Sequence, residues 1–403
     1  MASQPVTGSS LSSTGEVFWT ALRLGLTSFG GPIAHLGYFE RVYVREHRWL
    51  SSEEYGGFVS LCQLLPGPTS SQVGFLVGLH RAGWLGALAA WIGFTLPSAI
   101  LMYGFALLAP TVPAPPMQTI LHGLMLTAVV VVAQAVWSMA RALTPDLPRR
   151  VIALGAGVGV LVQHTGIAQL AALAGGAIAG SLVCKRLSAP NVRLARSPEP
   201  SAAWFALGLF MVLLVALPIL AIHSSRSPIA LASAFYRSGA LVFGGGHVVL
   251  PLLQQALVPT GWITDDRFLA GYGFAQAMPG PLFTLAAFLG AASTPTGSTF
   301  AWSALALVAI FLPGLLLAVA GLSMWARIAP MRFAQAALSG TNGAVVGVLA
   351  AALYDPVWTT GVRSALDLFI VLVGFVLLQW RKAPPILVAA LCVTASFGAA
   401  MLK

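Results

Sequence analysis

The sequence predicts an all-α polytopic membrane protein with about 13 transmembrane or re-entrant segments, arranged as two inverted repeats of six plus a linking helix. Three observations support this fold class. The 403 residues are 58% hydrophobic and only 8% charged, whereas soluble domains carry about 25% charged residues. A set of motifs occurs twice at nearly constant spacing. Equivalent segments are seven apart, and an odd separation inverts the second copy in the membrane.

The duplication is visible in elements rich in glycine, proline and tryptophan. Their offsets lie between 213 and 217 residues over roughly 100 residues of chain. Paired apolar segments interrupted by glycine and proline at matching places are typical of transporters built from two repeats. The matching elements are residues 29–32 and 243–246, Trp49 and Trp262, residues 63–68 and 276–281, Pro97 and Pro313, and Gly123 and Gly340.

A membrane-spanning helix needs about 20 apolar residues, and this criterion divides the chain into three parts. The first repeat is expected at 1–184, the linker and connecting helix at 185–223, and the second repeat at 224–403. A break is predicted around residues 163–166. The expected segments lie near 17–38, 56–80, 84–109, 118–141, 150–164, 166–184, 203–223, 229–252, 268–292, 299–325, 334–354, 364–380 and 383–401.

Charge predicts the orientation. The net charge of +10 is interpreted as positive charge in cytoplasmic loops rather than as a nucleic-acid surface. With a cytoplasmic N-terminus, the thirteen segments place thirteen Lys and Arg inside and six outside. Residues 40–54 conflict with this rule because they carry three Arg on the predicted outside, and a re-entrant first or second segment would remove the conflict. We expect a plasma (inner) membrane location, no cleaved signal peptide, and neither a disulfide framework nor a cysteine metal site.

The two Pro-Gly-Pro elements predict broken helices with anion-binding N-termini. Proline removes a hydrogen-bond donor and glycine permits a turn, so Pro68 and Pro281 are expected at the first position of a new helix. The free N–H groups there favour an anion. In the first half Thr69, Ser70 and Ser71 add hydroxyls, whereas the second half has Leu282, Phe283 and Thr284, so its site is expected to be drier. The alternative is a proline kink. The predicted site residues are Pro66, Gly67, Pro68, Thr69, Ser70, Pro279, Gly280 and Pro281.

The Phe-Gly-Gly elements predict either unwound turns that approach the substrate or close helix packing. The residues concerned are Gly30 and Gly31 in the first half and Gly244, Gly245 and Gly246 in the second. Arg23 and Arg237 lie inside their segments, where an arginine is costly and often functional. A planar guanidinium suits oxyanions, although both side chains could instead reach the nearer membrane surface.

Further polar residues complete the predicted site. Gln63, Gln276 and Asn342 are expected to contact the substrate or to hydrogen-bond between helices. His247 follows the second glycine run and is the preferred intramembrane proton carrier. Glu53 and Asp266 occupy equivalent positions before the Pro-Gly-Pro elements and are the alternative coupling pair, unless they are solvated loop acids.

The eleven acidic residues avoid the predicted bilayer centres. Buried cations without buried acids indicate an anionic substrate rather than a cation. The sequence contains no nucleotide-binding loop, metal cluster or hydrolase motif. No intramembrane Asp/Glu–His pair is expected, which argues against a membrane-embedded enzyme. We therefore expect a transporter rather than an enzyme, with no cofactor and no metal.

These motifs resemble the chromate ion transporter family in its two-domain form. The resemblance rests on residues 29–35, 63–68, 243–247 and 276–281, and it extends over both halves. It implies an inner-membrane secondary transporter that exports chromate and confers chromate resistance. Chromate is a tetrahedral dianion, so sulfate is a candidate competitor, and one repeat would rock against the other. The alternatives are a sulfate or other oxyanion transporter of this fold and a membrane-embedded lipid-phosphate enzyme. The expected partners are chromate and the lipid bilayer but no nucleic acid, and a homodimer is left open.

Overall fold

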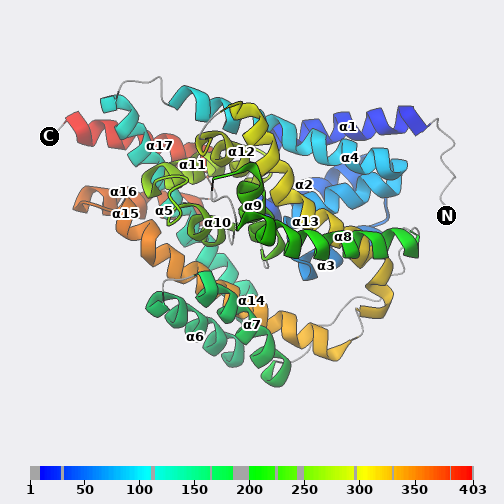
Figure 1. The fold of residues 1–403 in the computed structure, drawn as a ribbon. Helices are drawn as coiled ribbons and strands as arrows, with labels where there is room; N and C mark the ends of the chain where they lie inside the picture. The colour runs from blue at the N-terminus through cyan, green and yellow to red at the C-terminus, as the bar shows by residue number, and fades with distance from the viewer. Residues whose placement is uncertain are drawn as a thin grey trace.

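The structure is a computed structural model. It describes residues 10–28, 31–109, 114–163, 166–184, 199–222, 226–242, 249–294, 297–328, 331–381 and 383–401, and these contain helices and connecting turns but no strand. Helices α1 (Ser10–Thr27) and α17 (Pro385–Met401) lie at opposite ends of the molecule (Figure 1). The all-α class predicted from the sequence is confirmed for the described residues.

The remaining helices follow the predicted order. In the first half they are α2 (Gly31–Phe39), η1 (Glu40–Glu46), α3 (Ser52–Leu64), α4 (Thr69–Leu108), α5 (Ala114–Leu143), α6 (Leu147–Gln163) and α7 (Gly166–Val183). The connecting helix is α8 (Pro200–Ala221). The second half contains α9 (Pro228–Ala240), α10 (Val249–Leu257), α11 (Asp265–Ala277), η4 (Leu282–Thr284), α12 (Leu285–Ala292), α13 (Thr299–Ile328), α14 (Arg332–Ala352), η5 (Leu353–Trp358), α15 (Thr359–Gly361) and α16 (Ala365–Gln379).

Two expected spans of the first half are broken, each into two shorter helices. The segment expected at 17–38 is divided between α1 and α2, and the segment expected at 56–80 between α3 and the first part of α4. Helix α4 itself has two parts, residues 69–81 and 84–108, because Ala82 and Gly83 have non-helical backbone angles. A helix of 13 residues is about 20 Å long, which is too short to cross a hydrocarbon core of about 30 Å.

Both broken elements of the first half return to the end from which they start. Arg81 Nη2 lies 2.9 Å from Glu16 Oε2, and His47 Nδ1 lies 3.7 Å from Glu16 Oε1. The Arg81 guanidinium also stacks over the Trp49 ring at 5.4 Å. The start of α1, the turn before α3 and the end of the first part of α4 therefore meet. Two successive hairpins enter the molecule and return to the same end.

The second half repeats this arrangement. Arg226, just before α9, donates to the carbonyl oxygen of Gly261, just before α11, at 3.1 Å. The rings of Trp262 and Trp302 lie 5.8 Å apart, and Gly290 packs against the backbone of Trp302. The start of α9, the turn before α11 and the start of α13 therefore meet as their first-half counterparts do.

The two halves are interleaved rather than adjacent. Helix α14 of the second half packs against α6 and α7 of the first half, and the three lie together in the lower part of Figure 1. Helix α5 of the first half packs in turn against α16 and α17 of the second half. The fourth segment of each sequence repeat is thus held by the last two helices of the other repeat.

Five helical stretches are long and apolar enough to cross a membrane. They are Thr69–Leu108, of which only the part after the break at Ala82 and Gly83 is long enough, Gln118–Arg141, Pro200–Ala221, Thr299–Met324 and Gln335–Gly361. Shorter apolar helices such as Ala365–Gln379 accompany them. The protein is therefore an integral, multi-pass membrane protein. The total of 13 segments stays a prediction, since the described helices include several that turn back.

Candidate functional site

The Pro-Gly-Pro elements are turns between helices, as predicted. Gly67 has φ +124° and Gly280 has φ +94°, a region that residues with a Cβ rarely adopt. Pro68 is the N-cap residue of α4, one position before its first helical residue. Pro281 precedes the short 3-10 helix η4, which leads into α12. The broken-helix prediction is confirmed, with the first helical residue in each half shifted by one position.

Each turn is hydrogen-bonded to the other half of the molecule. The Gly67 N–H donates to the Val242 carbonyl oxygen at 2.7 Å, and the Gly280 N–H donates to the Ser28 carbonyl oxygen at 2.9 Å. Ser28 and Val242 are equivalent positions, each directly before a Phe-Gly-Gly element. The two bonds are therefore equivalent. In each, the Pro-Gly-Pro turn of one half donates to the carbonyl oxygen before the Phe-Gly-Gly element of the other half.

Each turn also packs against the residue that directly follows the Leu-Pro pair of the other half, inside α13 or α4. A Cβ on Gly67 would lie 2.8 Å from the Cα of Gly314, and a Cβ on Gly280 would lie 2.8 Å from Ser98 Oγ. The Gln72 amide donates to the carbonyl oxygens of Pro66 and Gly314, both at 2.9 Å. The turns therefore lie where the two halves meet, and there is no free space for a larger residue.

A buried polar cluster surrounds the first-half turn. We define it as Ser28, His35, Ser70, Ser71, Thr95 and Ser98, all of which are at most 2% exposed. His35 Nδ1 lies 3.3 Å from Ser70 Oγ, and the His35 ring packs edge-on against Phe94, the neighbour of Thr95. The Ser98 hydroxyl donates to the Thr95 carbonyl oxygen at 3.2 Å. Four elements, α1, α2, α4 and the second-half turn, thus contribute to one place.

Several atoms of this cluster have no protein partner. Ser28 Oγ, Ser71 Oγ and Thr95 Oγ1 are buried and make no hydrogen bond, and the His35 ring lies close to the backbone of Ser28. An unsatisfied buried polar group costs about 1–3 kcal/mol, so several in one place indicate a ligand or water site. The first three N–H groups of α4 add donors, because a helix leaves its first turn unpaired. The arrangement can bind an oxyanion through neutral donors at a helix N-terminus.

The equivalent positions of the second half are largely apolar. Val242 stands for Ser28, Val249 for His35, Phe283 for Ser70 and Phe311 for Thr95, at the offsets of the duplication. All four are buried. The sequence predicted a less polar second turn, and the helices around that turn are also less polar at these positions. The pseudo-symmetric framework holds an asymmetric polar centre.

The structure brings together some of the predicted site residues and separates others. Thr69, Ser70, Gly67 and Pro68 are buried at the first turn, and Gly280 reaches the same cluster. Arg23 and Arg237 have exposed side chains on α1 and α9. Gln63 is exposed, Gln276 hydrogen-bonds with Tyr272, and Asn342 is half-buried in α14. Asp266 forms an exposed ion pair with Arg363 at 3.1 Å.

Several predicted residues lie outside the described residues or are only partly described. Gly30, Gly244, Gly245, Gly246 and His247 fall in the gaps at 29–30 and 243–248. Gly31 is the first residue of α2 and Glu53 belongs to α3. Pro66, Pro279 and Pro281 lie in the turns themselves.

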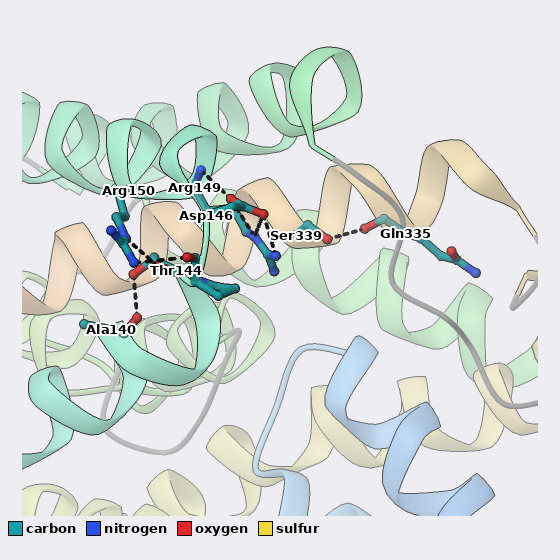
Figure 2. Close-up of polar contacts among 8 residues, drawn as sticks. Ala140, Thr144, Asp146, Arg149, Arg150, Gln335 and Ser339 are labelled. Carbon is teal, nitrogen blue, oxygen red and sulfur yellow. Dashed lines mark hydrogen bonds and ion pairs between the residues drawn. The ribbon is translucent and has the colours of Figure 1, made fainter.

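Arg149 and Arg150 lie in the first turn of α6 and bond to the turn that precedes it. Arg149 forms an ion pair with Asp146 at 2.7 Å, and Arg150 donates to the Thr144 carbonyl oxygen at 3.1 Å. Figure 2 shows these residues beside α14, where Ser339 donates to the Gln335 carbonyl oxygen. These contacts stabilise the turn between α5 and α6 and do not involve the predicted anion site.

One histidine–aspartate contact between helices was missed by the sequence reasoning. His122 Nε2 on α5 lies 2.8 Å from Asp367 Oδ1 on α16, and Asp367 is 5% exposed. Asp367 also accepts the backbone N–H of Arg363 at 3.0 Å. The expectation that no Asp/Glu–His pair lies within the apolar segments is therefore wrong. The partners are 245 residues apart, so no local pattern connects them.

These features define a class of protein. The chain is apolar and helical, its two sequence repeats interlock, and both halves contain a broken helix at the interface, as in secondary transporters with a central binding site. The chain belongs to the chromate transporter family, which matches residues 15–181 and again residues 229–397. The two matched regions correspond to the duplicated halves.

Individual relatives are similar over nearly the whole chain. A chromate transport protein of Pseudomonas aeruginosa is 27% identical over 354 residues, which cover 86% of this chain and 82% of the relative. A probable chromate transport protein of Synechococcus elongatus is 26% identical, covering 89% and 88%. A chromate transport protein of Cupriavidus metallidurans is 26% identical, covering 91% and 89%. No solved structure matches the chain.

Proposed function

We propose that this protein is a secondary transporter that exports chromate across the inner membrane and thereby confers chromate resistance. The observation that carries the proposal is the buried polar cluster at the N-terminus of α4, where the two halves exchange hydrogen bonds. Family membership and the names of the relatives support chromate as the substrate.

The chemistry of the cluster fits a tetrahedral oxyanion. The hydroxyls of Ser28, Ser71 and Thr95 each have one hydrogen to donate, whereas those of Ser98 and Ser70 are engaged with the Thr95 carbonyl oxygen and His35 Nδ1. These donors surround the unpaired N–H groups of α4, whose partial positive charge favours an anion. The dianion would be held by neutral donors, and it could leave the site without breaking a strong ion pair.

The return of both hairpins to one end supports the orientation. If Glu16, His47 and Arg81 share one membrane face, residues 40–54 lie on the side of the N-terminus. Arg41, Arg45 and Arg48 then move to that side, and Arg267 moves to the opposite side. The side of the N-terminus then has fifteen basic residues and the opposite side has four, whereas uninterrupted spans give thirteen and six. The positive-inside rule then places the N-terminus in the cytoplasm, and the conflict at residues 40–54 is removed.

The opposite ends reached by the two halves support an inverted repeat. The hairpins of the first half return to the end that contains Glu16, and those of the second half to the end that contains Arg226 and Gly261. A 25-residue helix, residues 84–108, is long enough to connect the two faces. The proposed units remain 1–184, 185–223 and 224–403, with the site between the first and third.

The alternatives predict different measurements. A sulfate or other oxyanion transporter would use the same donors, because sulfate is also a tetrahedral dianion. A lipid-phosphate enzyme would require an acid–base pair at its substrate. The His122–Asp367 pair supplies such groups, but they lie on α5 and α16, outside the polar cluster.

Flux in everted membrane vesicles tests the proposal. We expect accumulation of radiolabelled chromate, competition by sulfate, and no release of phosphate from lipid. Ser71→Ala and Thr95→Val should each reduce chromate flux about 10-fold to 100-fold, since a hydrogen bond to a charged group contributes about 1.5–3 kcal/mol. Matched controls are Ser181→Ala and Thr394→Val, whose exposed side chains bond only within their own helices. Unchanged chromate flux in both cluster variants would refute this site, and transport of sulfate alone would refute chromate as substrate.

A further inference from the structure

A second polar site lies away from the anion cluster. A cavity of about 350 Å³ is lined by residues from α6, α7, α10, α11, α14 and η5. It is located toward the end of the molecule that carries Gly261 and Asp266, because its walls contain the end of α6 and the starts of α7 and α11. The anion cluster lies beside the interface turns instead, so the two sites are separate.

The polar atoms that line this cavity are mainly acceptors. Asp265 and Asp355 contribute carboxylates, and Gln169, Gln254 and Gln255 contribute amides, whereas no basic side chain occurs among the described lining residues. Gln254 Nε2 donates to Asp265 Oδ1 at 2.7 Å, which fixes the carboxylate at the first residue of α11. Thr359 Oγ1 similarly donates to Asp355 Oδ1 at 3.3 Å.

Two amide oxygens in the wall have no partner. Gln169 is 3% exposed, and its Oε1 makes no hydrogen bond. Gln255 Oε1 is likewise buried and unpaired. A buried acceptor without a donor is costly, and both are in the wall that contains the two carboxylates. The residues that line the cavity thus include two carboxylates and two amide groups whose oxygens lack a donor, and this set of acceptors suits a cation rather than an anion.

We propose that this cavity binds a small monovalent cation such as Na⁺, held by Asp265, Asp355 and the amide oxygens of Gln169 and Gln255. Oxygen ligands suit hard cations. A divalent ion generally takes more charged ligands, and no group of three or more His, Cys, Asp or Glu residues arranged for a metal occurs in the described part of the chain. The cavity is larger than a bare ion, so part of the water shell would remain.

The cation dependence of thermal stability tests this site without any transport assay. The full-length protein, purified in detergent, is unfolded in NaCl and in choline chloride at equal ionic strength. A ligand that binds only the folded state raises the Tm in a saturable way, and we expect a rise of about 2 °C or more in NaCl. Asp265→Asn and Gln169→Leu should abolish the difference between the two salts, and Asp355→Asn provides a second carboxylate variant if either of these does not fold.

Asp266→Asn is the matched control. It removes the same charge from the neighbouring residue, but Asp266 is paired with Arg363 and does not line the cavity. Its Tm should keep the full response to NaCl. Equal Tm values in NaCl and choline chloride for the unmodified protein would overturn the proposal, as would a full Na⁺ response in Asp265→Asn and Asp355→Asn. Chromate flux is measured separately, so failure of this proposal and failure of the transport proposal are distinguishable.

Discussion

The Gly67 N–H donates to the carbonyl oxygen of Val242, 175 positions further along the chain, at 2.7 Å. The equivalent bond from Gly280 to Ser28 has a length of 2.9 Å. Both glycines have positive φ values, so backbone conformation and contact between the halves depend on the same two residues. The interface is therefore sensitive to single substitutions at these turns.

Gly67→Ala should impair transport and Gly67→Leu should abolish it. Positive φ costs a residue with a Cβ about 1–3 kcal/mol, and the Cβ would also collide with Gly314. Gly83→Ala is the control, because Gly83 has φ +66° but no neighbour within 4 Å of a Cβ. Chromate flux at equal protein level measures both effects. Full flux in Gly67→Leu would show that the turn is only a kink.

Single-cysteine labelling should place positions 48 and 83 on the cytoplasmic side, and positions 261 and 297 on the opposite side. All four residues are exposed. Cys184→Ser provides the background, since Cys62 and Cys392 are buried. Uninterrupted spans would instead put position 48 and position 83 on different sides. That outcome would reject the paired hairpins, and labelling of positions 83 and 297 from one side would reject the inverted repeat.

Arg23→Lys and Arg237→Lys determine whether the guanidinium groups bind the anion. A bidentate contact would be lost with lysine, whereas an exposed side chain that only reaches the membrane surface tolerates it. Because both side chains are exposed, we expect chromate flux to be retained in both variants. A large loss of chromate flux in either variant, at normal protein level, would indicate that this arginine binds the anion.

Asp367→Asn should destabilise the protein by about 1–3 kcal/mol, because it removes the buried charged partner of His122. Asp266→Asn is the exposed comparison and should cost at most about 1 kcal/mol. Thermal unfolding in detergent measures the difference. Equal Tm values for the two variants would mean that the His122–Asp367 pair contributes no more to stability than the exposed pair of Asp266.

Proton coupling is tested by the pH dependence of flux. His247→Gln should flatten the profile between about pH 6 and 8 if this histidine carries the proton, since an ordinary histidine titrates near 6.5. The Glu53→Gln/Asp266→Asn double variant tests the alternative pair of acids. Unchanged profiles in both proteins would leave facilitated movement or anion exchange as the mechanism.

The positions of the turns were predictable from the sequence, whereas the direction in which the chain continues after each turn was not. Proline and glycine at residues 66–68 and 279–281 determine where a helix stops, whatever surrounds it. Residues 17–38 are long enough for a spanning helix and largely apolar, so the pattern alone does not show that α2 turns back toward Glu16. That information comes from contacts such as Arg81 with Glu16 and Trp49.

The polar cluster was predicted only in part, for a similar reason. Ser70 and Ser71 follow the first turn directly and were predicted to donate hydroxyls. Ser28, Thr95 and Ser98 are single hydroxyls in apolar helices, and only tertiary packing brings them together. A signal was present, because the aligned second half has Val242, Phe311 and Gly314 at these positions. A comparison of the two halves for hydroxyl-to-apolar exchanges would have selected them.

The reciprocal bonds also constrain how such a chain could have arisen. A protein with one repeat would leave its Gly67 N–H and Ser28 carbonyl oxygen without partners, unless a second copy inserted upside down beside it. Fusion of two such copies fixes a one-to-one ratio and keeps both orientations in every molecule. Once joined, only one copy needs the hydroxyls, and the other is free to accumulate Val and Phe. The polar centre can therefore be asymmetric, because one repeat supplies the hydroxyls while both repeats still depend on the bonds between them.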